Sequence, residues 1–262
     1  MPAPTFALRH VALVTCDLGR ILPFYRDALG FIARQPDART VTLHFSAGAP
    51  AIITFTVDPA AVEPTERVAG LFHIALLVPD RPTLAAVLTR LIEHRQPIEG
   101  LSDHGVSEAL YLADPDGNGL EIYRDRPRAE WPMAGEQVAM VTRALDHRGL
   151  LRELPSPPPD TPLAHATFGH LHLSVSALAP ARMFYLNELG LAVRQDTYPN
   201  ALFLAADGYH HHVAVNTWGH PAPRGPQRFT GLAGFTAATS RVQAPRTLTD
   251  PDGTSVTLEP LS

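Results

Sequence analysis

Residues 101–125 read LSDHGVSEALYLADPDGNGLEIYRD, and this stretch predicts a β-hairpin that carries several chemically active side chains. Residues 108–113 have the character of a strand, and residues 120–123 form the returning strand. The six residues 114–119 (DPDGNG) predict a tight turn, because proline presets one φ angle and the glycine and asparagine positions tolerate positive φ. Glu121 stands in the middle of the returning strand, which is otherwise apolar. Burying its carboxylate is costly unless a cation or hydrogen-bond donors meet it, so it lies either in water on an edge strand or beside a cation.

Composition and charge exclude several classes of protein. The 262 residues are 45% hydrophobic and 18% charged, which is enough for one large domain or two ordinary ones. A net charge of −5 argues against nucleic acid or an anionic membrane as a partner. The single cysteine, Cys16, excludes an internal disulfide and suits a reducing compartment. Because the sequence has neither a signal-peptide pattern nor a long apolar run, we expect a cytoplasmic protein with no membrane partner.

The order of predicted elements repeats along the chain. Residues 8–14 predict a strand, residues 21–29 predict a short helix, and three strands follow. The same order, a βαβββ module, restarts at Gly70 and ends with the hairpin. A third start follows 160 residues after the first, because the same offset carries His10 to His170. A repeat of this length indicates a duplicated domain rather than a solenoid.

The last module is shortened, and a linker precedes the duplicated half. The DPDG motif recurs at 250–253, about 25 residues closer to the start of its module than in the hairpin, so we expect a lost helix and strand. We expect two domains, residues 1–125 with the metal site and residues 168–262 with the shortened module. Residues 126–167 form the linker, with a short predicted helix at 142–151 and a proline-rich segment.

Two histidines and the hairpin glutamate occupy matched positions. His10 and His73 each lie on the first strand of a module, and each precedes by seven residues an aspartate, Asp17 or Asp80, that begins the helix. If the first two modules pair into one curved sheet, both histidines and Glu121 converge inside it. A single histidine is more often hydrogen-bonded in a core, but the matched trio favours a metal. Two imidazoles and one carboxylate leave coordination positions open and suit non-haem Fe(II), with Mn(II) as the alternative.

These motifs resemble the vicinal oxygen chelate superfamily of glyoxalases, bleomycin-resistance proteins and extradiol dioxygenases. The similarity is greatest to its bacterial catechol-2,3-dioxygenase-like, ring-cleaving group. The motifs that carry the resemblance are HVAL at 10–13, FY at 24–25, GLFH at 70–73, DH at 103–104, SEALY at 107–111, DPDGNGLE at 114–121 and YHHH at 209–212. The resemblance implies an α+β fold in which tandem βαβββ modules pair into two half-open barrel domains.

The resemblance also implies an activity and roles for single residues. A metal held by His10, His73 and Glu121 would bind a catechol-type aromatic and O2, and the ring would be cleaved beside the diol. Tyr111, ten residues before the glutamate, matches a group that hydrogen-bonds substrate, and His104 lies near the place of a proton-transfer histidine. Two alternatives stay open, namely that Tyr111 is an aromatic residue of the core and that His104 is a solvated loop residue.

The second half offers an alternative metal site. His170 matches the first ligand, and His211 and His212 resemble the acid/base histidine on the fourth strand of the family, of which we take His212 as the catalytic candidate. The run 210–212 is also a candidate for a second metal.

The remaining positions of that half depart from the family pattern. Gly234 stands where the second histidine is expected, and Thr257 stands where the glutamate is expected, with Glu259 as a possible replacement. We therefore place the metal in the first half.

Two rival functions and a homodimer stay open. A glyoxalase-like isomerase or lyase would need a fourth protein ligand from the strand around residues 53–55, where Thr54 is a poor candidate. A protein that only sequesters small molecules would not need the histidine–glutamate trio. The shortened last module leaves its sheet less covered, so we expect it to pack against the first domain or a second copy of the chain.

Overall fold

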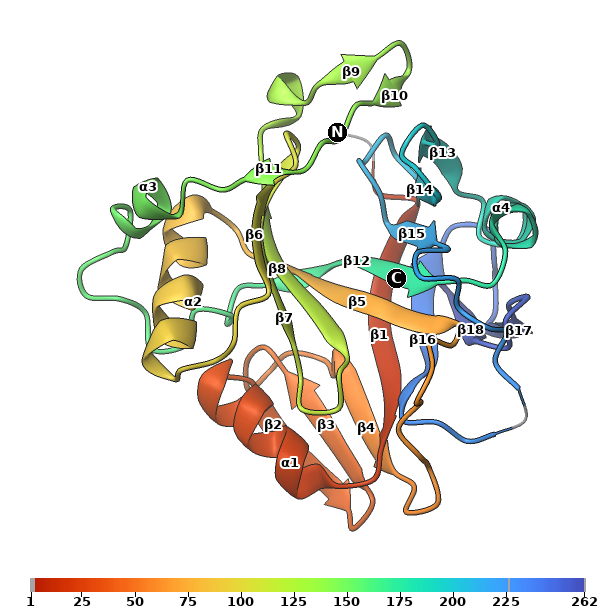
Figure 1. Cartoon of the computed structure of the whole chain (residues 1–262), viewed down its shortest axis with the longest axis horizontal. Helices are drawn as coiled ribbons and strands as arrows, with labels where there is room; N and C mark the ends of the chain where they lie inside the picture. Colours follow the sequence, from red (N-terminus) through yellow and green to blue (C-terminus); the bar gives the residue numbers. More distant parts are fainter. Residues whose placement is uncertain (1–2, 226, 262) are drawn as a thin grey trace.

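The computed structural model describes residues 3–225 and 227–261, which form two large, strongly curved β-sheets, one small two-stranded sheet and few helices (Figure 1). The mixed α+β fold of paired modules is therefore confirmed. Within the described part of the chain, a helix with the length and apolar character needed to cross a membrane is absent.

The first two modules have the predicted order of elements. Module 1 comprises β1 (Phe6–Thr15), α1 (Leu18–Leu22), the π-helix η1 (Pro23–Ala28), β2 (Ile32–Asp37), β3 (Thr40–His44) and β4 (Ile53–Val57). Module 2 comprises β5 (Gly70–Leu77), α2 (Arg81–Glu93), β6 (Gly100–Asp103), β7 (Ser107–Ala113) and β8 (Gly119–Asp125). Asp17 and Asp80 cap the helices as predicted, since their side chains accept hydrogen bonds from the backbone N–H groups of Gly19 and Thr83.

The second half repeats this order and then shortens it. Module 3 comprises β12 (Thr167–Ser174), α4 (Leu178–Asn187), β13 (Ala192–Gln195), β14 (Ala201–Ala205) and β15 (Val213–Asn216). Module 4 has only β16 (Gly231–Thr239), β17 (Arg246–Thr249) and β18 (Ser255–Pro260). The predicted truncation is confirmed, because a turn over residues 240–245 replaces the helix and one strand.

The connection between modules 2 and 3 contains only short elements. They are η2 (Arg128–Glu130), β9 (Met133–Ala134), β10 (Gln137–Val138), β11 (Arg143–Ala144) and α3 (His147–Leu151). The helix covers only the second part of the predicted range, because β11 pairs with β6 and takes residues 143–144 into the sheet.

The modules pair in a different way from the prediction. One sheet has the order β17-β18-β16-β1-β4-β3-β2 and joins modules 4 and 1. The other has the order β11-β6-β7-β8-β5-β12-β15-β14-β13 and joins modules 2 and 3. In Figure 1, β5 and β12 cross the centre side by side. The expectation that residues 1–125 and 168–262 each close a sheet of their own is therefore corrected.

The physical reason lies in the edges of the first strands. The first strand of every module offers the same row of backbone donors and acceptors. The order of elements within a module therefore does not decide which strand edges pair. In the structure β1 runs antiparallel to β16, and β5 runs antiparallel to β12. The connections that lead into β5 and β16 support this choice, because Val62 pairs with Phe229 and Val68 pairs with Ala222.

Strand alternation decides which side chains enter the half-barrel of modules 2 and 3. On β5, Ile74 and Leu76 join the large apolar core beneath the helices. His73 and Ala75 lie on the opposite face of the same strand. That face is the interior of the half-barrel, and it holds the candidate site.

Candidate metal centre and substrate cavity

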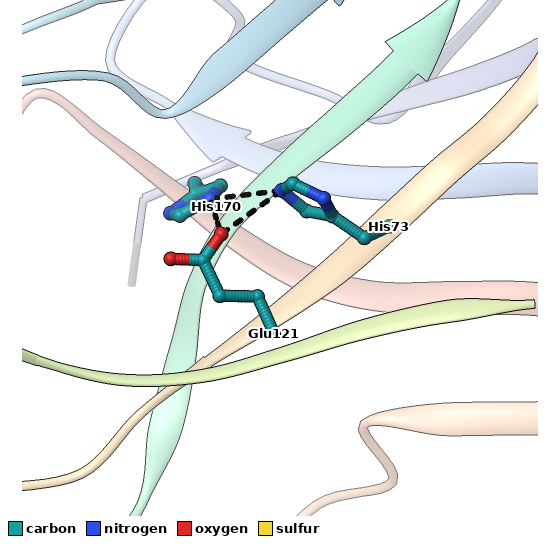
Figure 2. A group of neighbouring side chains, drawn as sticks. All are labelled: His73, Glu121 and His170. Carbon is teal, nitrogen blue, oxygen red and sulfur yellow. Dashed lines mark hydrogen bonds and ion pairs between the residues drawn. The ribbon is translucent and has the colours of Figure 1, made fainter. Parts of the chain in front are cut away.

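Two histidines and a glutamate meet inside the half-barrel of modules 2 and 3. His73 comes from β5, Glu121 from β8 and His170 from β12, and all three side chains are buried. Figure 2 shows the two imidazole rings and the carboxylate pointing toward one another. In the described part of the chain, the possible ligand atoms of these three residues all lie within 4.8 Å of one another.

The strand register explains this convergence. Ala75 of β5 pairs with Glu121 on one side and with His170 on the other, so these three residues form one row across the sheet. His73 lies two positions away on β5 and shares the face of Ala75. Adjacent strands are about 4.8 Å apart, so a histidine on β12 and a glutamate on β8 reach a point above β5.

The distances between the three ligand atoms fit binding to a single metal ion from one side. His73 Nε2 lies 3.0 Å from Glu121 Oε2, His170 Nε2 lies 3.1 Å from the same oxygen, and the two nitrogens are 3.3 Å apart. Ligands about 2.1 Å from a common centre are about 3.0 Å apart at 90° and about 3.4 Å apart at the tetrahedral angle. The two shorter distances match the right-angled arrangement, which leaves the opposite positions open for other ligands.

The donor set also favours a cation over hydrogen bonds alone. If both imidazoles donated to Glu121, two N–H groups would face each other between His73 and His170. A cation at this point accepts a lone pair from all three atoms and removes that conflict. Burial by itself would raise the pKa of Glu121, but the charge and hydrogen bonds of His170 and His73 outweigh it and hold the pKa well below its ordinary value.

The structure does not bring His10 to this group. His10 lies on β1 in the other sheet, opposite Thr236 of β16, and its Nε2 is 2.7 Å from Thr54 Oγ1. The predicted set of His10, His73 and Glu121 is therefore corrected to His73, Glu121 and His170. The cause is the module pairing, because the strand beside β5 is β12 and not β1.

In the other sheet, only one of the three equivalent positions holds a residue that could bind a metal. Gly234 and Thr257 stand at the places of His73 and Glu121, and His10 stands at the place of His170. Glu259 is exposed on β18. A shallow cavity lies there against His10, Gly234 and Thr257, without a second histidine or a buried carboxylate among its described lining residues.

A cavity of about 290 Å³ adjoins the trio. Its apolar wall includes Phe72, Met140, Val141, Tyr198, Phe203 and Trp218, and polar side chains such as Ser102, Thr142 and His172 complete the lining. Met140 and Val141 come from the segment between β10 and β11, which crosses to module 3, where Gln195 bonds the backbone of Met140. The sequence did not single out this segment, since it lacks a strong strand or helix pattern.

Tyr111 and His104, the two side chains that the family resemblance singled out, line this cavity. The Tyr111 hydroxyl is 2.7 Å from His104 Nε2, and His104 Nδ1 is 2.7 Å from the carbonyl oxygen of Val141. Since a carbonyl only accepts, His104 Nδ1 donates to it, and Nε2 of the neutral ring accepts the Tyr111 proton. Burial, followed by the charge of Glu121, raises the pKa of Tyr111 well above its ordinary value, so the phenol stays protonated.

His211, not His212, faces the cavity. The His211 ring packs against His170 with centroids 3.9 Å apart and lines the cavity. His212 points the opposite way, where its Nδ1 accepts from Ala206 N–H at 3.2 Å and its ring packs against Phe6. The choice of His212 is corrected for this reason, since the two adjacent side chains point to opposite sides in the bend that precedes β15.

Comparisons with known proteins identify the family of the chain. The model of the Glyoxalase/Bleomycin resistance protein/Dioxygenase superfamily matches residues 7–122. The chain is 42% identical over 236 residues to the protein named catechol-2,3-dioxygenase of Bacillus subtilis (strain 168), covering 87% of this chain and 80% of that protein.

Solved structures show the same fold at low identity. A putative dioxygenase from Bacillus subtilis subsp. subtilis str. 168 superposes with a TM-score of 0.59 at 14% identity, over 98% of this chain and 86% of that one. Glyoxalase I from Zea mays superposes with a TM-score of 0.56 at 14% identity, over 97% and 92%. On the strength of the 42% identical relative and the matching family model, the chain belongs to the glyoxalase/bleomycin resistance protein/dioxygenase superfamily.

Proposed function

We propose that the protein is an extradiol dioxygenase, which opens the ring of a catechol-type aromatic with O2 at a non-haem metal held by His73, Glu121 and His170. One observation carries the proposal, namely three ligand atoms 3.0, 3.1 and 3.3 Å apart beside a largely apolar cavity of about 290 Å³. The catechol-2,3-dioxygenase relative supports the same reaction class.

The donor set suits Fe(II), with Mn(II) as the alternative, because two imidazoles and one carboxylate with open positions are typical of non-haem iron oxygenases. When bound, the metal would hold both catechol oxygens and O2 side by side and carry electrons between them. The chain itself orients the substrate, excludes water and handles protons.

Three side chains are placed to handle protons and hydrogen bonds. Tyr111 points its proton at His104, so its oxygen is left to accept a hydrogen bond from a substrate hydroxyl. His211, rather than His212, is the general base for the other catechol hydroxyl, since its ring lines the cavity beside His170.

The cavity wall favours a small, uncharged ring. Aromatic side chains from Phe72, Phe203 and Trp218 provide flat apolar contacts for a single aromatic ring. The described residues that line the cavity include neither lysine nor arginine, so a carboxylate on the ring would lack a permanently charged partner.

Metal content and turnover together test the proposal. The protein is purified without oxygen and without chelator, and its metal is measured before O2 uptake and the ring-opened product are followed with catechol. We expect near-stoichiometric iron or manganese, and O2 uptake that matches product. Nickel or zinc with isomerase activity would overturn the proposal in favour of a glyoxalase-like enzyme, and a metal-free protein that binds small aromatics would overturn it in favour of sequestration.

A further inference from the structure

A chain of hydrogen bonds leads from the cavity to the far end of β8. His211 Nδ1 lies 2.8 Å from Nδ1 of His210, and His210 Nε2 lies 2.8 Å from Asp125 Oδ1. The second carboxylate oxygen of Asp125 accepts from the Tyr209 hydroxyl at 2.8 Å, and that hydroxyl lies 2.8 Å from the Tyr123 hydroxyl. Neither the metal ligands nor the Tyr111–His104 pair uses these bonds.

Packing prevents His210 from turning away from this arrangement. Its side chain is fully buried, and the Tyr209 ring lies against it with centroids 4.0 Å apart. Trp131 closes another side of the ring, with centroids 5.2 Å apart. Both nitrogens of His210 are therefore held at their partners.

The direction of each hydrogen bond follows from donor and acceptor chemistry. The Asp125 carboxylate only accepts, so His210 Nε2 carries the proton of that bond. A neutral imidazole has a single N–H, which leaves His210 Nδ1 as an acceptor. The close contact between the two Nδ1 atoms then requires His211 Nδ1 to donate.

We infer that Asp125 and His210 are positioning residues that fix the tautomer of His211. They hold its proton on Nδ1, so that Nε2 keeps a lone pair for a hydroxyl group in the cavity. The use of this lone pair by a catechol rests on the proposed function, but the tautomer does not. Asp125 therefore acts on the cavity through the rings of His210 and His211.

The tautomer is directly measurable. Ring 15N chemical shifts of histidine-labelled full-length protein, metal-free and loaded with zinc as a diamagnetic ion, distinguish Nδ1–H from Nε2–H. We expect Nδ1–H at His211 in the parent and a mixture or the opposite tautomer in Asp125→Leu, which has a similar shape and no acceptor. Tyr209→Phe is the matched control, because it removes a donor to Asp125 while His210 keeps its carboxylate, and we expect it to keep Nδ1–H.

Kinetics provide the second readout. With catechol, Asp125→Leu is expected to lower kcat by about 100-fold, at the lower end of what a positioned proton-transfer group contributes, with KM changed less than about threefold. His210→Phe fills the same space and is expected to give the same split, which guards against a folding failure of the aspartate variant.

The two hypotheses fail in different ways. Nε2–H at His211 in the parent, or an unchanged tautomer in both Asp125→Leu and His210→Phe, would overturn the positioning role. Nδ1–H in the parent with loss of that tautomer in the variants, but no catechol turnover in any protein, would support the positioning role and overturn the proposed function.

Discussion

Replacing His170 by alanine separates the observed module pairing from the predicted one. His170 contributes one of three ligand atoms, and its Nε2 is 3.1 Å from Glu121 Oε2 and 3.3 Å from His73 Nε2. Without it, one imidazole and one carboxylate are left to hold a cation. The same substitution at His10 is the matched control, since His10 lies on the corresponding first strand of module 1 but in the other sheet.

The size of the effect follows from linkage. At a free metal concentration of about 100 times Kd, binding stabilises the parent by about 2.7 kcal/mol. This corresponds to a rise in Tm of about 5–10 °C for a chain of this size. Loss of a second-sphere partner already costs about 10–100-fold in affinity, so loss of a ligand should cost at least about 100-fold. The same metal concentration then equals Kd or less, and the stabilisation falls to about 0.4 kcal/mol, or roughly 1 °C.

The assay is thermal unfolding with and without Fe(II) or Mn(II) under anaerobic conditions, with metal content measured in parallel. We expect the metal-dependent rise in Tm in the parent and in His10→Ala, and its near absence in His170→Ala. A full rise in His170→Ala together with its loss in His10→Ala would refute the observed pairing as the basis of the metal site.

Four further predictions concern the cavity and the turn that begins β8. Tyr111→Phe keeps the ring but removes the hydroxyl next to His104; it should lower kcat/KM for catechol by about tenfold with metal content unchanged, and an unchanged kcat/KM would contradict its role. A carboxylated catechol should bind at least about tenfold more weakly than catechol in a competition assay, since the described lining residues include neither lysine nor arginine. Burial raises the pKa of Asp114 to about 6, although hydrogen bonds from Asn118 and Tyr25 oppose this rise. The folded state therefore binds the proton of Asp114 more tightly than the unfolded chain, which contributes about 3 kcal/mol of stability below the ordinary aspartate pKa and is lost as pH rises through 6. Asp114→Asn should flatten that part of the pH dependence of the unfolding free energy in urea titrations. Gly119→Ala should lower the free energy of unfolding by about 2 kcal/mol, because its Cβ would clash with the backbone carbonyl oxygen of Phe72. Gly48→Ala, where the Cβ would meet open space, should change it by less than about 0.5 kcal/mol.

The sequence by itself determined the local features of this protein. Strand and helix periodicity, the aspartate caps and the DPDG turns are set by neighbours in the chain, so the βαβββ order and the truncated last module could be predicted. The same holds within the hairpin, where Tyr111 and Glu121 face each other across β7 and β8. The 160-residue offset also identified His170 as equivalent to His10, although not as a ligand of the actual site.

Only the tertiary structure decided which modules meet and which side chains share the cavity. Strand edges pair through backbone groups that are alike in every module. Which strand pairs with β5 therefore depends on how all the modules pack and on the segments that connect them. That choice replaced His10 by His170. The tertiary structure also decided that His211 and not His212 faces the cavity. The two adjacent side chains point to opposite sides, and backbone hydrogen bonds of His212 to Leu171 of β12 and Leu204 of β14 fix which side each one takes.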